Sequence, residues 1–379
     1  MVASRWRRVG ALVREQPLHP LRSLHLYVYA RWTVQYVGLL RGTWPQWRIA
    51  ARPGRNATPG DATPDDATPG LPSDATPVAT AGAGTRRGRV SAAAAEYAAN
   101  YLAATYHGKV LRTEAARVLV TLDHDLTAGP MEQVVPYRVA RDIVIKNPTM
   151  IVAYECPCRA ARDAAEAGSV GRGRDCGPLD VCLVIGSPLA EFILSVRPEK
   201  ARLIDGSQAL SLLDEAHRRG NVHTAWFKEA AFGRLYAICN CCSCCCAGLS
   251  AMRGGIDAVA PSGYVAQVEA GLCDGCGACV RACPVGASTF PAVIDGARGT
   301  ASVAAGECIG CGVCVDRCSC GALRLELAAG APLPLEGPWV PGLRVPAGAG
   351  RSQAPRRRRF HPCRRAGRCR SRGSLPRAS

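Results

Sequence analysis

The sequence predicts an α+β fold: a small cysteine-rich α/β domain, then a compact module of short strands around two cysteine loops, with a disordered linker and a disordered tail. Three observations predict it. Short β-like and helix-like stretches alternate over residues 90–260. One spacing of four cysteines occurs twice within 261–329. The compositions of 51–89 and 330–379, rich in Pro, Gly and Ala and ending in Arg, cannot bury a core. A basic, aromatic segment, 1–50, precedes the linker.

The positive charge is concentrated at the two ends of the chain. The net charge is +17, with eleven Arg and no acid in 351–379, and ten Arg against Glu15 in 1–55. The stretch between them is close to neutral, so nucleic-acid binding is not expected of the folded centre. Arg22 and Arg31 interrupt the apolar part of the N-terminal segment, which is therefore too short to span a bilayer. We expect this segment to dock on the chain itself or, as the alternative, to make peripheral contact with a membrane.

The elements can be placed from apolar periods and stop signals. Repeated Ala-Thr-Pro units make 51–89 a linker. Thr113 is a suitable N-cap for one helix, Asn147-Pro148 a stop for another, and Gly220 a stop for a third. The expected helices are 92–102, Thr113–Val120, Pro136–Lys146 and Ser207–Arg219; the expected strands are Ile151–Tyr154, Val181–Ile185, Tyr264–Val268 and Ala322–Leu327.

The strongest pattern is a repeated C-x2-C-x2-C-x3-C motif. Its two copies are displaced by 35 residues: Cys273, Cys276, Cys279 and Cys283, then Cys308, Cys311, Cys314 and Cys318. Three cysteines at every third position can reach three irons of one cube, and the fourth points toward the other cluster. We therefore expect two 4Fe–4S clusters, one held by Cys273, Cys276, Cys279 and Cys318, the other by Cys308, Cys311, Cys314 and Cys283. Zinc is the alternative, but four-ligand zinc has no use for the crossed cysteine.

These residues resemble the bacterial dicluster ferredoxins, which implies a ferredoxin-like dicluster module for electron transfer. Gly275, Gly277, Gly310 and Gly312 fit, because glycine lets the backbone approach the inorganic sulfides. The resemblance covers roughly a sixth of the chain. Ser319 follows the last cysteine where the family usually has Pro, which could alter the local turn.

Ten further cysteines form a second pattern upstream. Cys-Pro-Cys-Arg begins it, and six cysteines within eight residues end it; the full set is Cys156, Cys158, Cys176, Cys182, Cys239, Cys241, Cys242, Cys244, Cys245 and Cys246. Four thiolates could hold a third Fe–S cluster or a zinc ion, and the others could form a redox-active dithiol. The remaining alternative is that Cys176 and Cys182 are a loop thiol and a buried strand residue, with no site.

The order of these motifs resembles a group of bacterial and archaeal cysteine-rich 4Fe–4S binding proteins. That resemblance implies an iron–sulfur oxidoreductase or its electron-transfer component, working with a redox partner protein. His217 and His223 could be ligands or proton carriers, but the stronger expectation is that they are solvent-facing or core residues. No Gly-rich dinucleotide loop or P-loop is seen, and no small-molecule substrate can be identified. The cysteine usage predicts a reducing, cytoplasmic compartment. The expected function is electron transfer; the alternatives are a reductase in its own right and a redox-sensing regulator.

Overall fold

The computed structural model describes residues 27, 30–31, 106–128, 133–135, 143–166, 177–228, 231, 233–253, 256, 258–290, 299–337, 340 and 343. The chain divides into two compact units, 1–345 and 346–379, and all of the described residues lie in the first. The expected linker, the helix at 92–102 and the Arg-rich end of the tail lie outside the described residues.

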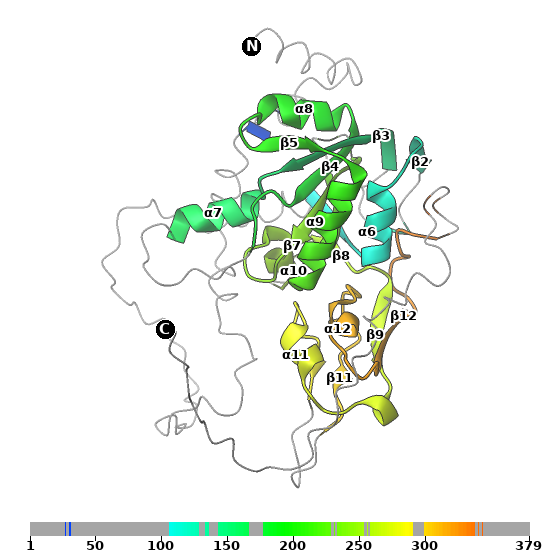
Figure 1. Ribbon diagram of the computed structural model, residues 1–379. Helices are drawn as coiled ribbons and strands as arrows, with labels where there is room; N and C mark the ends of the chain where they lie inside the picture. Colours follow the sequence, from blue (N-terminus) through cyan, green and yellow to red (C-terminus); the bar gives the residue numbers. More distant parts are fainter. Residues whose placement is uncertain are drawn as a thin grey trace, which may run out of the picture. The chain divides into compact units, whose positions relative to one another are not determined.

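An eight-stranded sheet forms the centre of the α/β part (Figure 1). Its path order is β2-β3-β4-β7-β6-β1-β8, with β5 also paired to β3. Only the β1–β8 pair is parallel among the described pairs. The strands are β1 Tyr106–Leu111, β2 Leu126–Ala128, β3 Ile143–Tyr154, β4 Cys182–Ser187, β5 Ala201–Ile204, β6 Val222–Lys228, β7 Leu235–Cys241 and β8 Val259–Ala260.

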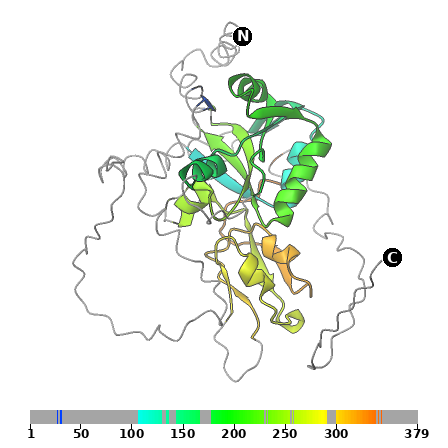
Figure 2. The ribbon, with the colours of Figure 1, turned by 60° about the vertical axis from the view of Figure 1, so that its left-hand side comes forward.

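Helices cover both faces of this sheet (Figure 2). Alternate strand residues enter different cores: Val152 and Val184 lie in one cluster, and Ile151 and Leu183 in the other. The first core includes residues of α8 (Leu189–Val196) and α10 (Ala247–Arg253). The second includes residues of α6 (Thr113–Val120) and α9 (Gly206–Arg218). Helix α7 spans Pro157–Glu166 and follows β3 directly. The central strands are therefore buried on both faces.

The cysteine-loop module follows the sheet. Strands β9 (Tyr264–Val268) and β12 (Leu323–Leu327) pair antiparallel, with Tyr264 opposite Leu327 and Val268 opposite Leu323. Between them lie η2 (Ala270–Leu272), α11 (Ala278–Ala282), the antiparallel pair β10 (Ser288–Thr289) and β11 (Ser302–Val303), and α12 (Val313–Asp316). The outer strands thus bring the two cysteine loops into one small core.

A segment after β12 packs on the α/β part. Leu335, Val340 and Leu343 are buried in the same core as α6 and α9. Leu333 donates its backbone N–H to the carbonyl of Gln133 at 2.7 Å. This differs from the disordered tail expected from residue 330, because buried leucines anchor a segment whose Pro/Gly content indicated disorder.

The structure agrees with some of the predicted helices and contradicts one of them. The structure has the expected helix Thr113–Val120, but its N-cap is Arg112, and α9 begins at Gly206 behind the capping box of Asp205 and Gln208. The helix expected over Pro136–Lys146 is wrong in its described part, because Ile143–Lys146 belong to β3. Ile143 and Ile145 are buried in alternation with more exposed neighbours, which is the period of a strand.

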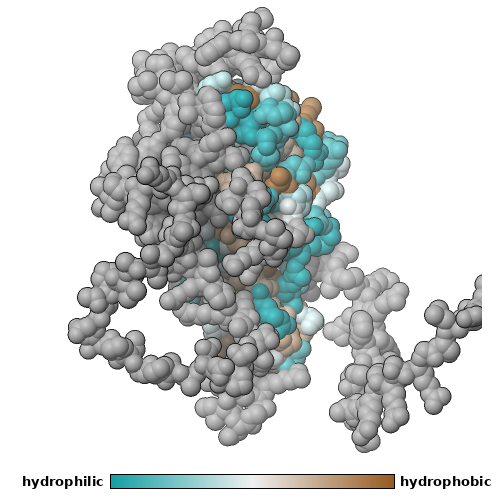
Figure 3. Space-filling view, turned by 90° about the vertical axis from the view of Figure 1, so that its left-hand side faces the viewer, coloured by the Kyte–Doolittle hydropathy of each residue, from teal (hydrophilic) through white to brown (hydrophobic). Residues whose placement is uncertain are grey.

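The described surface is mostly hydrophilic on the face shown in Figure 3, with small separate hydrophobic areas. The exposed large hydrophobic residues Leu203, Leu272 and Leu327 lie on three different elements. Within the described part of the chain, no helix is both long enough and apolar enough to cross a membrane.

Candidate metal centres

Four cysteines of the C-terminal module surround one pocket, and we call them the first thiol set: Cys273, Cys276, Cys279 and Cys318. Cys273 and Cys276 come from the loop between η2 and α11, Cys279 lies in α11 itself, and Cys318 follows α12, from the other half of the repeat. The pocket measures about 300 Å³, its solvent-facing space included. Burial, with the thiols of Cys273 and Cys318, raises the pKa of Cys279. Three cysteines of the first motif therefore lie around one pocket with the fourth cysteine of the second motif, as the spacing predicts.

The second thiol set is Cys283, Cys308, Cys311 and Cys314. Burial raises the pKa of Cys311 to about 12, and the nearby thiols of Cys283 and Cys308 contribute. Burial and the same neighbours also raise the pKa of Cys314. Cys283 follows α11 in the first half of the repeat, yet its thiol acts on the cysteines of the second half.

Both loops have the same backbone conformation at their glycines. Gly277 and Gly312 are left-handed N-caps of α11 and α12, with φ of 73° and 80°. Gly310 has φ 64°, and a Cβ there would lie 2.2 Å from both Ser262 Oγ and the carbonyl O of Tyr264. A side chain is excluded at that position by conformation and by space.

A family model described as "4Fe-4S dicluster domain" matches residues 272–322. The chain carries a 4Fe–4S dicluster domain. The match covers both cysteine motifs, which agrees with the resemblance seen in the sequence. No curated protein matches the chain.

The thiols of the dicluster domain suit iron–sulfur ligation. A buried thiol whose pKa is raised ionises only beside a positive charge, which a metal supplies. The two sets each offer four thiols from both halves of the repeat. The residues present therefore fit the group that the family match implies.

Cys320 is a further thiol that the sequence analysis missed. It lines the same pocket as the first thiol set, and its Sγ lies 3.5 Å from Cys318 Sγ. Cys320 stands in the sequence Cys-Ser-Cys, next to Ser319, which replaces the usual Pro. The first copy of the motif has no cysteine at the matching position, so the repeat does not predict a role for Cys320.

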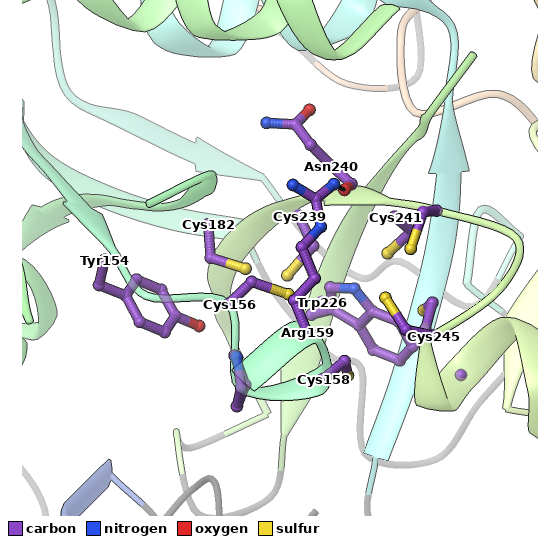
Figure 4. Close-up of a pocket in the computed structure, with 14 residues that line it drawn as sticks. Tyr154, Cys156, Cys158, Arg159, Cys182, Trp226, Cys239, Asn240, Cys241 and Cys245 are labelled. Carbon is purple, nitrogen blue, oxygen red and sulfur yellow. Dashed lines mark hydrogen bonds between the residues drawn. The ribbon is translucent and has the colours of Figure 1, made fainter. Parts of the chain in front are cut away.

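The upstream cysteines gather in the first core of the α/β part. Eight of them line one pocket of about 420 Å³, solvent-facing space included, which is larger than the pocket of the first thiol set by the same measure. Figure 4 shows labelled cysteines around this pocket from the junction of β3 and α7, the start of β4, the end of β7 and the loop before α10. Cys176 lies outside the described residues. No disulfide joins the described cysteines.

Six of these thiols form a closed ring of hydrogen-bonded neighbours, here called the six-thiol ring. Cys156 contacts Cys158 and Cys182, and these hydrogen bonds, with the positive charge of Arg159, lower its pKa. The thiols around the ring follow the order Cys156, Cys158, Cys246, Cys241, Cys239 and Cys182. Ala247 also donates its backbone N–H to Cys158 Sγ at 3.4 Å.

The other three cysteines form a separate three-thiol group: Cys242, Cys244 and Cys245. Their sulfurs all lie within 4.8 Å of one another, and Cys244 Sγ is 3.4 Å from Cys242 Sγ. The adjacent cysteines of 239–246 therefore lie in two neighbouring arrangements.

Three arginines place positive charge beside the upstream thiols. Arg159 is 1% exposed, donates to the carbonyls of Pro178 and Asn240, and lies close enough to Cys242 and Cys245 to interact electrostatically. Arg162 Nη1 lies 3.5 Å from Cys244 Sγ. Arg253 interacts electrostatically with Cys242, Cys244 and Cys246. This charge favours thiolates over thiols, whereas hydrogen bonds to neighbouring thiols and burial raise the pKa of other ring members such as Cys158.

The two histidines lie on the opposite face of the sheet from the ring. Asn240 stands between Cys239 and Cys241 in β7, so its side chain points away from theirs, and it accepts a hydrogen bond from His223 Nδ1 at 2.6 Å. His223 is buried and stacks on His217. His217 bonds through its ring nitrogens to Thr113 Oγ1 and to Asp316 Oδ2. The two histidines therefore serve as core and interface residues, with the sheet between them and the thiols.

Hydrogen bonds and a shared hydrophobic core join the dicluster domain to the upstream centre. Arg253 donates to the carbonyl of Pro284 at 3.3 Å and to that of Ser243 at 2.6 Å, and so links the residue after Cys283 to the three-thiol group. Ile309 is part of the core that contains Cys241 and Cys246, and Cys311 packs against it. It is thus the second thiol set that faces the upstream cysteines.

Proposed function

We propose that this chain is an iron–sulfur electron-transfer protein, in which two 4Fe–4S clusters of the dicluster domain connect an external redox partner protein with the upstream cysteine centre. A component of an oxidoreductase in a reducing compartment fits this role. The observation that carries the proposal is the contact between the second thiol set and the upstream centre, through Arg253, Ile309 and Cys311.

The burial of the thiols suggests an order for the relay. Cys276 of the first thiol set is exposed, whereas Cys311 and Cys314 of the second are partly or fully buried. A partner protein can approach the exposed first set most closely. The second set then stands between that entry and the upstream cysteines, so each transfer covers a shorter distance than a direct one.

The residues of this chain tune the relay through charge and hydrogen bonding. When bound, each cluster supplies a site that gains or loses one electron. The backbone N–H of Ala322 donates to Cys318 Sγ at 3.2 Å, and Arg253 holds positive charge between the second set and the upstream centre. Both features stabilise the more negative, reduced state.

The first test is anaerobic determination of iron, acid-labile sulfide and zinc per chain. Two cubanes require about eight irons, and roughly twelve would place a further cluster on the upstream cysteines. Electron paramagnetic resonance of the reduced protein should then show two interacting signals, of which Cys276→Ser weakens one and Cys311→Ser the other. Zinc with little iron, or loss of both signals only together, would contradict the relay.

A second candidate function is supported by the nine described upstream thiols, which exceed the needs of one four-ligand cluster. The chain would then be a reductase with its own thiol centre. Anaerobic alkylation of the iron-loaded protein, followed by peptide mass spectrometry, distinguishes the two. A reductase should have an upstream thiol that reacts fast at neutral pH while the iron content stays constant. A simple relay should have none.

A further inference from the structure

Among the described residues outside the dicluster domain, the three-thiol group is a closely spaced set of possible metal ligands. Cys242, Cys244 and Cys245 come from one turn, in which the N–H of Cys246 donates to the carbonyl of Cys242 at 3.3 Å. The turn gathers three thiols on one side, while Cys246 itself belongs to the six-thiol ring.

We propose that Cys242, Cys244 and Cys245 bind a single zinc-type metal ion through three thiolates and leave its fourth coordination position open to a small anionic ligand. This group is part of the upstream centre, but its binding of a metal ion does not depend on electron transfer through the dicluster domain. Zinc is the best candidate because soft thiolate ligands select it among divalent ions.

The spacing of the sulfurs favours one ion over a cubane. Zn–S bonds of about 2.3 Å in a tetrahedron place the sulfurs about 3.8 Å apart. The three sulfurs here lie within 4.8 Å of one another, with one pair at 3.4 Å. A cubane holds each thiolate on a different iron and so sets its ligands farther apart. Only small movements of the three sulfurs would bring them to the positions that a single zinc ion requires.

The ligand count leaves one position open. Within the part of the chain that the structure describes, no His, Asp, Glu or fourth Cys joins this group of ligand atoms. Structural zinc sites close their tetrahedron with four protein ligands, whereas sites with three keep the fourth position for water or substrate. Cys244 is partly exposed, which gives the group a route to solvent.

The surrounding charges select an anion for that position. Three thiolates and a divalent ion together carry one negative charge. Arg159, Arg162 and Arg253 add three positive charges beside them, and Asp163, which accepts from Arg162 Nη2 at 3.3 Å, removes one. Arg162, whose Nη1 lies 3.5 Å from the Sγ of the partly exposed Cys244, can pair with a small anion bound there, so an anion is favoured over a neutral ligand.

Metal analysis with two variants tests the site. The iron-loaded chain should hold about one zinc, and zinc-edge X-ray absorption should show three sulfurs near 2.3 Å and one lighter atom. Cys244→Ser should lower the zinc content at least fivefold and leave iron unchanged, whereas the ring variant Cys239→Ser should leave zinc unchanged. The proposal would be overturned by any of three results: equal zinc content in the wild-type chain and Cys244→Ser, four sulfurs around the zinc, or no zinc in the wild-type chain.

The anion can be tested without relying on a variant that folds poorly. Co²⁺ in place of zinc gives visible bands that report tetrahedral thiolate ligation, and azide is the anionic probe. We expect azide to shift these bands in the wild-type chain, and Arg162→Gln to raise the azide concentration needed at least threefold. Arg324→Gln, an exposed arginine on β12, is the control. The proposal of an open position beside the arginines would be overturned if azide did not shift the bands. It would also be overturned if Arg162→Gln and Arg324→Gln responded equally to azide.

Discussion

Cys318 and Cys320 place two thiols at one corner of the first thiol set. Their sulfurs lie 3.5 Å apart, and both residues line the pocket with Cys273 and Cys276. If Cys318 is substituted, the thiol of Cys320 can therefore take its place as a ligand. No other cysteine of the first thiol set has such a neighbour among the described residues.

This redundancy predicts unequal effects of cysteine substitution. Cys318→Ser should keep most of the iron of the first cluster, Cys276→Ser should lose it, and the double variant Cys318→Ser/Cys320→Ser should behave like Cys276→Ser. Iron content and the reduced-state resonance signal measure the outcome. Equal iron loss in Cys318→Ser and in the double variant would show that Cys320 does not substitute.

His223 predicts a dependence of stability on pH. Burial lowers its pKa from 6.5 to about 4, with His217 adding to the effect and the bond to Asn240 opposing it. The unfolded chain then binds one more proton than the folded chain between these values, so stability falls as pH drops from 6.5 to 4, by up to about 3 kcal/mol.

The matched variant is His223→Gln, which can still donate to Asn240 but does not titrate. Urea unfolding under argon at pH 7 and pH 5 should show a smaller loss of stability for His223→Gln than for the wild-type chain. Comparison of the two removes acid effects on the clusters. The same loss in both proteins would contradict a neutral buried His223.

At the scale of elements, the loop of the second thiol set is anchored on the start of β9. Ser262 donates its backbone N–H to the carbonyl of Ile309 at 3.0 Å and its hydroxyl to that of Gly310 at 2.8 Å. Gly310→Ala would drive a Cβ into Ser262 and Tyr264, so the loop must move away from β9. We expect about half of the dicluster iron to be lost.

Gly321→Ala is the matched control for this clash. Gly321 also has a left-handed φ, 70°, but a Cβ there meets nothing within 4 Å. Gly321→Ala should lower the free energy of unfolding only by the conformational strain, about 1–2 kcal/mol, and the protein should keep its iron. If both variants lose iron equally, the strain of the backbone, and not the contact with β9, controls the loop.

The sequence predicted those elements whose signals are local. The apolar period and stop residues placed α6 and α9 closely, and the cysteine spacing predicted the two thiol sets. The helix expected over Pro136–Lys146 failed because Asn147-Pro148, taken as its stop, lies within β3, where Ile143 and Ile145 alternate with more exposed residues. Which strands pair, and that most pairs are antiparallel, depends on contacts between distant segments.

The upstream centre shows the same limit. Its cysteines were evident in the sequence, but their division into a six-thiol ring and a three-thiol group arises where β3, β4 and β7 end together. The separation of His223 from the thiols likewise follows from the alternation of β7, and no spacing in the sequence indicates which face a residue takes.

At the scale of the whole described molecule, the chain closes on itself after the dicluster domain. Arg112 pairs with Glu336 at 2.6 Å, and Lys109 donates to the carbonyl of Pro332 at 3.4 Å. Leu335 is fully buried in the core with α6 and α9. The segment therefore ties both sides of the dicluster domain to the sheet, since β8 leads into the domain and this segment leads out of it.

This closure predicts that the return segment stabilises the α/β part as well as the dicluster domain. Leu335→Ala should lower the free energy of unfolding by about 2–5 kcal/mol, the cost of a large cavity in a core. Leu327→Ala changes the same residue type at a site that is 63% exposed, and should stay within about 0.5 kcal/mol of the wild-type chain. Urea unfolding followed by circular dichroism measures both, and iron release during the same titration reports the dicluster domain. If the segment joins the two parts, Leu335→Ala should bring iron release and loss of the sheet to lower urea together. A variant that unfolds the sheet earlier while iron is retained would show that the segment stabilises the α/β part alone.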